Sequence, residues 1–533
     1  MQKILPIFYI LSSLLIFKND LRAQQIIGKL TVERHEVYDS LVGDWFFGAP
    51  FMNSIHGLTK EHIITDELLF EEGDELDTLL MQETERNLRA TGLFTDAYFV
   101  VLDTFEDGSL HMHLVTQDRW STSPTPIASY KAGVRQYGGR FTESNLFGYG
   151  TNIRMEVVNT NRNNTGWQGD LAITQRRLLR TEMNVRGRLF GNRFKTVEEL
   201  DITKPYRTIA MPWAWNLSGS NSFGSDFIFR EGAAEQLRFK EQFAQGWLSH
   251  KWLRSDQVML SGYISARKAE RDQRLAFDNS ARFLVGFSSL RQRFAKDKLL
   301  NGYQTEDIVT GGWGTVVLGK VLPIGDEGEN LYYVGGRAEQ SVLLDNHRVY
   351  LFGQVAAGSG FGQNRAQYTY QESRGKGFFR FSQNSVISAQ FRQQTAWNWS
   401  AFRQLVLDNQ SGLRGYAPNQ LAGENRFLGN VEWRYFMHLP VWFFRFSGAL
   451  FYDAGTVWNQ QTPITKTRWH HSIGPGFRFH TTTGGSLLLA ADLPYNFDTK
   501  RFVPVLSSSY AFSIHDQHMY DFPRIFGEEY DLE

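Results

Sequence analysis

From about residue 123 to residue 514, apolar and polar residues alternate with a period of two. Residues 427–435 show the pattern clearly, because large apolar side chains share one face and polar side chains share the other. The apolar face holds Phe427, Val431, Trp433 and Tyr435, and the polar face holds Asn430, Glu432 and Arg434. Successive side chains of a strand point to opposite faces, so the pattern predicts β-strands with one apolar and one polar face.

A soluble sheet would need a second apolar layer of similar size, and no such layer is legible in the sequence. A transmembrane antiparallel β-barrel instead turns the aromatic face to lipid and keeps arginines and carboxylates in a wet lumen. We therefore expect a membrane all-β fold. At roughly 25 residues per strand and loop, residues 123–514 predict about 16 strands. Four polar or glycine-rich stretches are assigned to loops: 158–169, 265–280, 325–330 and 460–468.

The start of the chain carries its longest apolar run. Lys3 precedes the apolar residues 4–17, and Ala23 stands at a suitable cleavage site. The run is shorter than the ~20 residues of a spanning helix, so residues 1–23 are predicted to be a signal peptide. Retention of this segment as an N-terminal anchor is the alternative.

Residues 24–122 predict a small mixed domain. Residues 26–38 alternate like a strand, Thr59 can cap a helix that ends near Phe70, and Asp77 opens a second helix that Gly92 can end. Two further strands, 97–103 and 109–116, flank an Asp-Gly pair typical of a hairpin. The expected order is strand, helix, helix, strand, strand. A generic α+β domain is the simplest interpretation.

Composition removes several function classes. Lys and Arg number 56 and so do Asp and Glu, a balance that disfavours nucleic-acid binding. Cysteine is absent, which excludes thiolate metal sites, cysteine nucleophiles and anchoring by a lipidated cysteine. His111 and His113 share a strand face but lack a third ligand, and residues 353–362 lack the helix that a phosphate loop requires. We expect no metal, no cofactor and no enzymatic activity.

The N-terminal region resembles a POTRA domain of the BamA/TamA outer-membrane superfamily, also called the bacterial surface antigen family. The resemblance is carried by residues 57–77, 83–101 and 107–120. Only one such domain fits before residue 123, whereas BamA-type members carry several. POTRA domains bind extended polypeptide at a sheet edge, so the resemblance implies Tyr98 and Phe99 as binding candidates. Burial of both residues in the domain core is the alternative.

Motifs in the second part of the chain resemble the barrel of the same superfamily. Residues 413–416 (L-R-G-Y) match the motif at the tip of the family's sixth extracellular loop, and residues 451–455 match its F-x-D-x-G strand. Residues 143–150, 432–434 and 474–478 match its N-L-F-G-x-G, E-x-R and G-x-G-x-R segments. The ordered set covers essentially the whole mature chain.

In that superfamily the loop arginine docks against the strand aspartate, so the resemblance implies that Arg414 docks on Asp453 and, more loosely, on Glu432. The alternation places Asp453 and Glu432 on the luminal face, where a guanidinium folded into the barrel needs a carboxylate. The expected luminal tether comprises Arg414, Gly415, Tyr416, Glu432, Asp453 and Gly455. An exposed turn at Arg414 is the alternative.

The resemblance implies an integral outer-membrane protein with its N-terminal domain in the periplasm. Its function would be to insert β-barrel proteins or to pass polypeptide across the membrane, and its partners would be outer-membrane lipid and unfolded polypeptide clients. A passive pore or structural barrel is the alternative, and a barrel enzyme is less supported. Residues 515–533 form a polar, acidic tail where family barrels stop at an aromatic strand, which suggests contact with periplasmic or lipoprotein accessory subunits.

Overall fold

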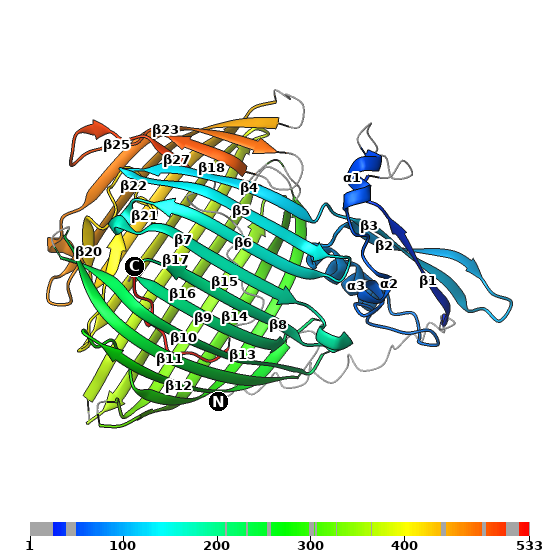
Figure 1. Ribbon diagram of the computed structural model, residues 1–533, viewed down its shortest axis with the longest axis horizontal. Helices are drawn as coiled ribbons and strands as arrows, with labels where there is room; N and C mark the ends of the chain where they lie inside the picture. The colour runs from blue at the N-terminus through cyan, green and yellow to red at the C-terminus, as the bar shows by residue number, and fades with distance from the viewer. Residues whose placement is uncertain are drawn as a thin grey trace, which may run out of the picture. The chain divides into compact units, whose positions relative to one another are not determined.

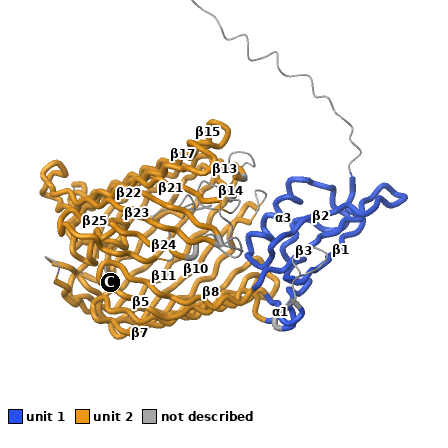
Figure 2. Tube along the Cα trace, turned by 90° about the horizontal axis from the view of Figure 1, so that it is seen from above, with its two compact units in different colours: residues 1–120, 147–149 blue, residues 121–146, 150–533 orange. Residues whose placement is uncertain are grey.

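The chain divides into two compact units, shown in Figure 2. The computed structural model describes residues 25–38, 49–207, 211–230, 233–252, 257–297, 303, 306–326, 328–363, 365–438, 444–481, 487–507 and 522–531. The first unit comprises residues up to Trp120 together with 147–149, and the second comprises residues 121–146 and 150 onward. The predicted signal peptide, residues 1–23, lies outside the described residues. None of the described helices has the length and hydropathy needed to span a membrane.

The first unit is a three-stranded sheet with helices. Its elements are β1 (Ile27–His35), α1 (Ala49–Ile55), α2 (Glu61–Thr65), α3 (Thr78–Ala90), β2 (Phe94–Thr104) and β3 (Leu110–Asp118). The sheet order is β1-β3-β2, with β1 parallel and β2 antiparallel to the central β3. Ile64, Leu88 and Leu114 form its fully buried centre. The predicted small α+β region is confirmed.

Two local predictions in this unit have different outcomes. Asp77 does cap α3, since its side chain accepts a hydrogen bond from the Leu79 amide at 2.8 Å. Thr59 does not cap a helix, because its amide and hydroxyl both donate to the buried Asp118 carboxylate at 2.8 Å. Helix α2 accordingly begins at Glu61 and ends at Thr65, well before residue 70.

The second unit is a closed antiparallel barrel (Figure 1). Its first strands are β4 (Thr122–Lys131), β5 (Val134–Leu146), β6 (Thr151–Thr160), β7 (Gly166–Gln175), β8 (Asn184–Asn192), β9 (Lys195–Lys204), β10 (Trp213–Arg230), β11 (Ala233–Trp252), β12 (Gln257–Arg271), β13 (Ser280–Asp297) and β14 (Glu306–Pro323). They continue with β15 (Leu331–Leu344), β16 (Val349–Gly362), β17 (Arg365–Ser382), β18 (Ser385–Trp397), β21 (Asn425–Phe436), β22 (Phe444–Trp458), β23 (His470–Thr481), β24 (Leu487–Asp492), β25 (Tyr495–Asn496), β26 (Arg501–Phe502) and β27 (Val505–Ser507). A separate short hairpin, β19 (Leu405–Leu407) with β20 (Leu421–Gly423), lies between β18 and β21.

Within the described residues the barrel has 20 strands, so the predicted number of about 16 is wrong. Strands β24 and β25 both pair with β23 and count as one interrupted strand, and β26 with β27 forms the next. The error arose because luminal polar residues of strands resemble loop residues. Residues 158–160 belong to β6 and residues 265–271 belong to β12, although the sequence assigns both to loops.

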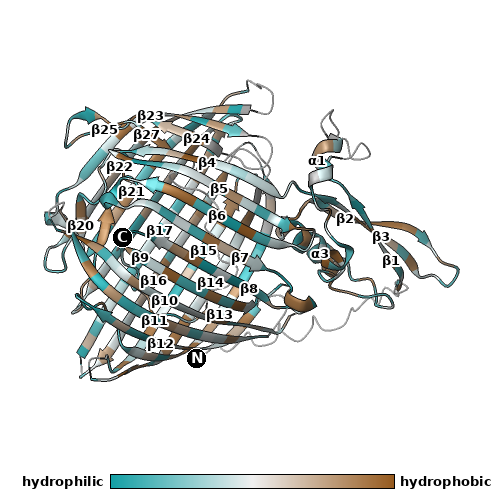
Figure 3. Ribbon diagram, in the orientation of Figure 1, coloured by the Kyte–Doolittle hydropathy of each residue, from teal (hydrophilic) through white to brown (hydrophobic). Residues whose placement is uncertain are grey.

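The two faces of the wall follow the predicted alternation. On β21, Val431 and Trp433 are 47% and 40% exposed, whereas Glu432 and Arg434 are each 1% exposed. Apolar and polar residues alternate along the strands in Figure 3. A closed barrel satisfies the backbone hydrogen bonds of its strands internally, and an apolar outer face suits it to lipid. The second unit is therefore built as a transmembrane β-barrel.

The lumen is packed with protein rather than empty. An apolar cluster inside it includes Tyr263, Tyr333 and Tyr370 from the wall, so not every aromatic side chain faces outward. Ile525 and Phe526 from the C-terminal tail belong to the same cluster. The described residues of the tail therefore lie inside the barrel, and contact of the tail with a periplasmic partner stays a prediction. The remaining tail residues, 508–521, 532 and 533, lie outside the described residues.

Candidate functional site

The loop between β18 and β21, residues 398–424, carries the L-R-G-Y motif at its turn. Asp408 shapes the approach to this turn, since its side chain accepts from the amides of Gln410 and Ser411 at 2.8 and 2.9 Å. Gly412 and Gly415 both have positive φ, at 116° and 83°. These left-handed positions favour glycine, and the two residues between them, Leu413 and Arg414, are both buried.

Arg414 is the centre of the site. Its guanidinium donates to both carboxylate oxygens of Asp453, through Nε and Nη2, at 2.8 Å each. Its Nη1 donates to Glu432 Oε2 at 2.6 Å, and its backbone amide donates to Asp453 at 3.3 Å. Arg414 is 3% exposed, and Asp453 is fully buried. A bidentate arginine–carboxylate pair fixes both distance and orientation, so this loop has one defined position in the lumen.

The charges around Arg414 balance. Three arginines (Arg414, Arg434 and Arg478) meet three carboxylates (Glu432, Asp453 and Asp492), each 9% exposed or less. Glu432 links the groups, because it also accepts from Arg434 Nε at 2.7 Å and from Arg478 Nη2 at 3.2 Å. Asp492 completes the set beside Arg478, with an oxygen 3.6 Å from Arg414. We name these six residues the luminal ion cluster. A buried charge without a partner is costly, so a neutral cluster is what permits this burial.

The F-x-D-x-G motif on β22 supplies three contacts from one strand face. Phe451 lies under the Arg414 guanidinium, with Cζ 3.5 Å from the ring centroid. Asp453 binds the guanidinium, and Gly455 leaves space for Leu407 of the loop, because a Cβ there would lie 2.8 Å from Leu407 Cδ2. The period of two explains the spacing, since residues 451, 453 and 455 all face the lumen.

Gly415 and Tyr416 fasten the other side of the turn. The Gly415 carbonyl accepts from Asn496 Nδ2 at 2.9 Å, and its amide donates to Asn409 Oδ1 at 3.0 Å. Tyr416 is fully buried and its hydroxyl donates to the His471 carbonyl at 3.0 Å. The loop therefore contacts the wall from β21 to β25.

The loop also contacts the opposite side of the barrel closure. Arg162, between β6 and β7, donates to Asn419 Oδ1 at 2.8 Å and lies 3.5 Å from Asp408. The closure itself pairs β27 with β4 through two described residue pairs, Val505 with Lys131 and Leu506 with Tyr130. The loop thus contacts the wall on both sides of the closure, at the β6–β7 connection through Arg162 and at β25 through Asn496.

All six residues of the expected tether take part in this arrangement, and their functional role remains a proposal. Arg434 and Arg478 belong to the sequence motifs but were not expected in the tether. Asp492 and Asn430 were not predicted either, although the Asn430 amide donates to Asp453 at 2.7 Å. Asn430 shares the luminal face of Glu432, so the alternation could have indicated it.

The two candidate binding residues of the N-terminal domain, Tyr98 and Phe99, differ in their exposure. Tyr98 is 40% exposed on the edge strand β2, whereas Phe99 packs on Phe70 with ring centroids 5.4 Å apart. The backbone of β2 is occupied here, because Arg89 donates to the Ala97 carbonyl at 2.8 Å and Glu85 accepts from the Phe99 amide at 2.9 Å. A strand added at residues 97–99 would have to displace both side chains.

The two histidines of β3 have local partners. Both His111 and His113 contact the Thr31 hydroxyl, and His113 lies 2.6 Å from Glu33. In the described part of the chain, no group of three or more His, Cys, Asp or Glu residues could hold a metal ion.

Fold and site together define a transmembrane β-barrel whose luminal loop is held by a buried arginine. Among solved structures the chain is similar to BamA from Haemophilus ducreyi lacking POTRA domains 1–3 (15% identity over 90% of this chain and 83% of that one, TM-score 0.43). It is also similar to CdiB from Acinetobacter baumannii (12%, 90% and 73%, TM-score 0.45) and CdiB from Escherichia coli (12%, 90% and 76%, TM-score 0.44). No protein-family model matches the chain, and no curated protein does.

Replacing Arg414 by Gln is expected to destabilise the barrel by about 3–5 kcal/mol, because Asp453 and Glu432 would keep buried charges without their partner. Thermal unfolding of the purified protein, followed by heat-dependent gel mobility, measures the effect. Arg468→Gln is the matched control, since Arg468 pairs with Asp498 but its side chain is 73% exposed. Equal melting temperatures of the two variants would contradict the assignment.

Gly455→Ala is expected to cost about 1–3 kcal/mol, because the new methyl group would lie 2.9 Å from the Phe427 carbonyl oxygen. Gly187→Ala on β8 is the control, as a Cβ there meets nothing within 4 Å. The same unfolding assay should show a loss for Gly455→Ala alone. An unchanged Gly455→Ala variant would mean that Leu407 does not need this space.

Arg162→Ala is expected to weaken the closure, since it removes the contacts that Arg162 makes with Asn419 and Asp408 of the loop. Hydrogen–deuterium exchange should then accelerate in residues 122–131, and the exposed Arg230→Ala serves as control. Unchanged exchange in β4 would show that the loop does not support the closure.

Proposed function

We propose that this chain is an integral outer-membrane protein that inserts β-barrel proteins into the membrane, or passes polypeptide across it, without a cofactor. Its N-terminal domain would lie in the periplasm, and its partners would be outer-membrane lipid and unfolded polypeptide clients. Accessory subunits in the periplasm or anchored as lipoproteins are compatible with this role. The observation that carries the proposal is the fixed position of Arg414 in the luminal ion cluster.

The closure is the seam where β27 pairs with β4, the first strand of the barrel. An unpaired strand edge is a template for another chain. A barrel that opens here needs a second element to keep its walls in register, and the loop that contacts both sides of the closure can supply it.

Strand addition to the N-terminal sheet was expected at Tyr98 and Phe99, and the contacts of β2 disfavour it there. Because Arg89 and Glu85 occupy the β2 backbone at residues 97–99, strand addition at that position competes with contacts inside the domain. We therefore place strand templating at the barrel closure. The exposed Tyr98 remains available for a side-chain contact with a client.

A passive pore is the alternative function, and the filled lumen weighs against it. Residues of the loop, including Trp399, and of the tail, including Phe526, pack with the wall in one apolar cluster. A diffusion pore keeps a water-filled channel through its centre. The observed lumen suits a barrel that opens only when a polypeptide is handled.

Depletion of the protein from cells, followed by comparison of outer-membrane and secreted proteomes, tests the function. Loss of integral barrel proteins is the result expected of an inserter, and loss of secreted protein is the result expected of an exporter. Deletion of residues 25–120 should abolish either activity, whereas a pore would keep its conductance. Unchanged proteomes after depletion would contradict the proposal.

A further inference from the structure

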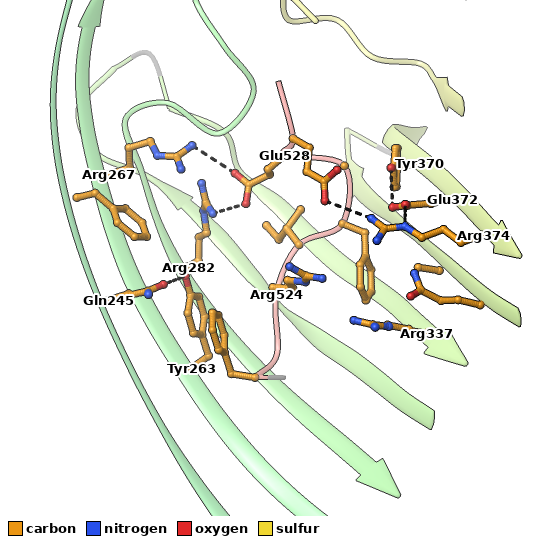
Figure 4. Close-up of a pocket in the computed structure, with 18 residues that line it drawn as sticks. Gln245, Tyr263, Arg267, Arg282, Arg337, Tyr370, Glu372, Arg374, Arg524 and Glu528 are labelled. Atoms are coloured by element: carbon orange, nitrogen blue, oxygen red, sulfur yellow. Dashed lines mark hydrogen bonds and ion pairs between the residues drawn. The ribbon is translucent and has the colours of Figure 1, made fainter. Parts of the chain in front are cut away.

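The described part of the C-terminal tail, residues 522–531, lies inside the barrel and has a turn at residues 526–527 (Figure 4). It forms no strand of the barrel sheet. Its backbone contacts are few and go to single side chains or to the loop: the Phe526 amide donates to the Tyr333 hydroxyl at 2.9 Å, and the Asp531 amide donates to the Gln404 carbonyl at 3.0 Å. The tail is therefore held mainly by its side chains.

Three carboxylates of the tail face arginines of the wall. Glu528 lies 3.3 Å from Arg267 and 2.6 Å from Arg282, as Figure 4 shows. Glu529 pairs with Arg392, and Asp531 accepts from Arg426 at 2.6 Å. The four arginines come from β12, β13, β18 and β21, and we call them the arginine surface. Arg267 and Arg392 also pair with wall carboxylates, Glu241 and Glu372, whereas Arg282 and Arg426 pair with the tail.

Aromatic contacts set the position of the tail along this surface. Phe522 stacks on Tyr263 with ring centroids 5.4 Å apart, and Phe526 is 7% exposed within the luminal apolar cluster. Gly527 has a φ of 93°, and a Cβ there would lie 2.7 Å from Tyr370. The wall thus accepts an aromatic anchor followed by a turn and then the acidic residues.

The wall depends on the tail for its charge balance. In the described residues, Glu528 is the sole carboxylate within ion-pair distance of Arg282, and Asp531 is the sole one for Arg426. Arg282 is 3% exposed, and its Nε and Nη2 have no hydrogen-bond partner. If the tail leaves, two largely buried arginines lose their counter-ions, which is unfavourable unless other anionic groups replace them.

The surface is also incompletely filled. A cavity of about 420 Å³ lies between tail and wall and is lined by Arg267, Arg282, Arg337 and Arg374, among others. This arrangement contrasts with the luminal ion cluster, whose six charges balance within the wall and its loop. Arg282 and Arg426 differ from that cluster, because their carboxylate partners lie on the tail.

We propose that this arginine surface is a binding site for an extended client segment that combines an aromatic anchor with carboxylates, and that residues 522–531 occupy it until such a segment displaces them. The proposal rests on the proposed function, because it names the chemistry of the polypeptide that the barrel handles. The tail is then an intramolecular competitor of the client. Without a client it occupies the site and supplies the counter-ions, and a bound client would supply them in its place. We call the tail in this role the cis competitor.

Peptide binding to the full-length protein in detergent or nanodiscs tests the proposal. The probe is a fluorescent peptide with the sequence of residues 522–531. The protein is compared with a neutral-tail variant, Glu528→Gln, Glu529→Gln and Asp531→Asn, and with a chain lacking residues 522–531. Both variants should bind the probe about tenfold or more tightly than the wild type, because their cis competitor is weakened or absent.

Two matched controls distinguish binding at this site from nonspecific peptide binding. A probe carrying the same three neutral substitutions should lose the gain in affinity. Adding Arg282→Gln and Arg426→Gln to the neutral-tail variant should abolish binding of the acidic probe, while heat-dependent gel mobility confirms a folded barrel. Equal binding of acidic and neutral probes, or no gain in either tail variant, would overturn the proposal.

The outcome is distinguishable from failure of the proposed function. Selective probe binding with unchanged proteomes after depletion would leave the site standing and remove the assembly or export role. Altered proteomes without selective probe binding would do the reverse.

Discussion

The rest of the lumen depends on the ion pair between Arg414 and Asp453. Neither charge could be buried alone, because removing an ion from water without a partner costs several kcal/mol. The luminal ion cluster offsets this cost by pairing three arginines with three carboxylates from four strands and the loop. Once Arg414 is fixed, the 398–424 loop has a defined place, and its residues Leu407 and Tyr416 can pack in one apolar cluster with Leu428 of β21.

The loop in turn supports the tail. Asp531 accepts from the Val406 amide at 2.8 Å and contacts Gln404, eight to ten residues before Arg414 in the same loop. Contacts from the loop therefore reach the β6–β7 connection through Arg162 and the tail through Asp531. A substitution of Arg414 would therefore alter the loop's contacts near the closure and at the arginine surface, although Arg414 itself contacts neither.

The sequence predicted the faces of strands better than their number. Alternation is a local property, so it placed Glu432 and Asp453 on the luminal side, and the motifs indicated their partner Arg414. The strand count failed because a luminal face rich in polar residues resembles a loop, as in residues 265–271 of β12. The position of the tail could not be predicted either. Its carboxylates find their arginines on four strands far away in sequence, and no local pattern encodes that meeting.

The Arg414–Asp453 pair fixes the position of the 398–424 loop in the lumen. Exchanging the two charges tests this most directly, by comparing Arg414→Asp, Asp453→Arg and the double variant in growth complementation and in thermal unfolding. We expect each single exchange to impair both readouts and the double variant to restore them in part, since the pair is re-formed with opposite polarity. A silent Arg414→Asp variant, or a double variant as impaired as the two single effects combined, would contradict it.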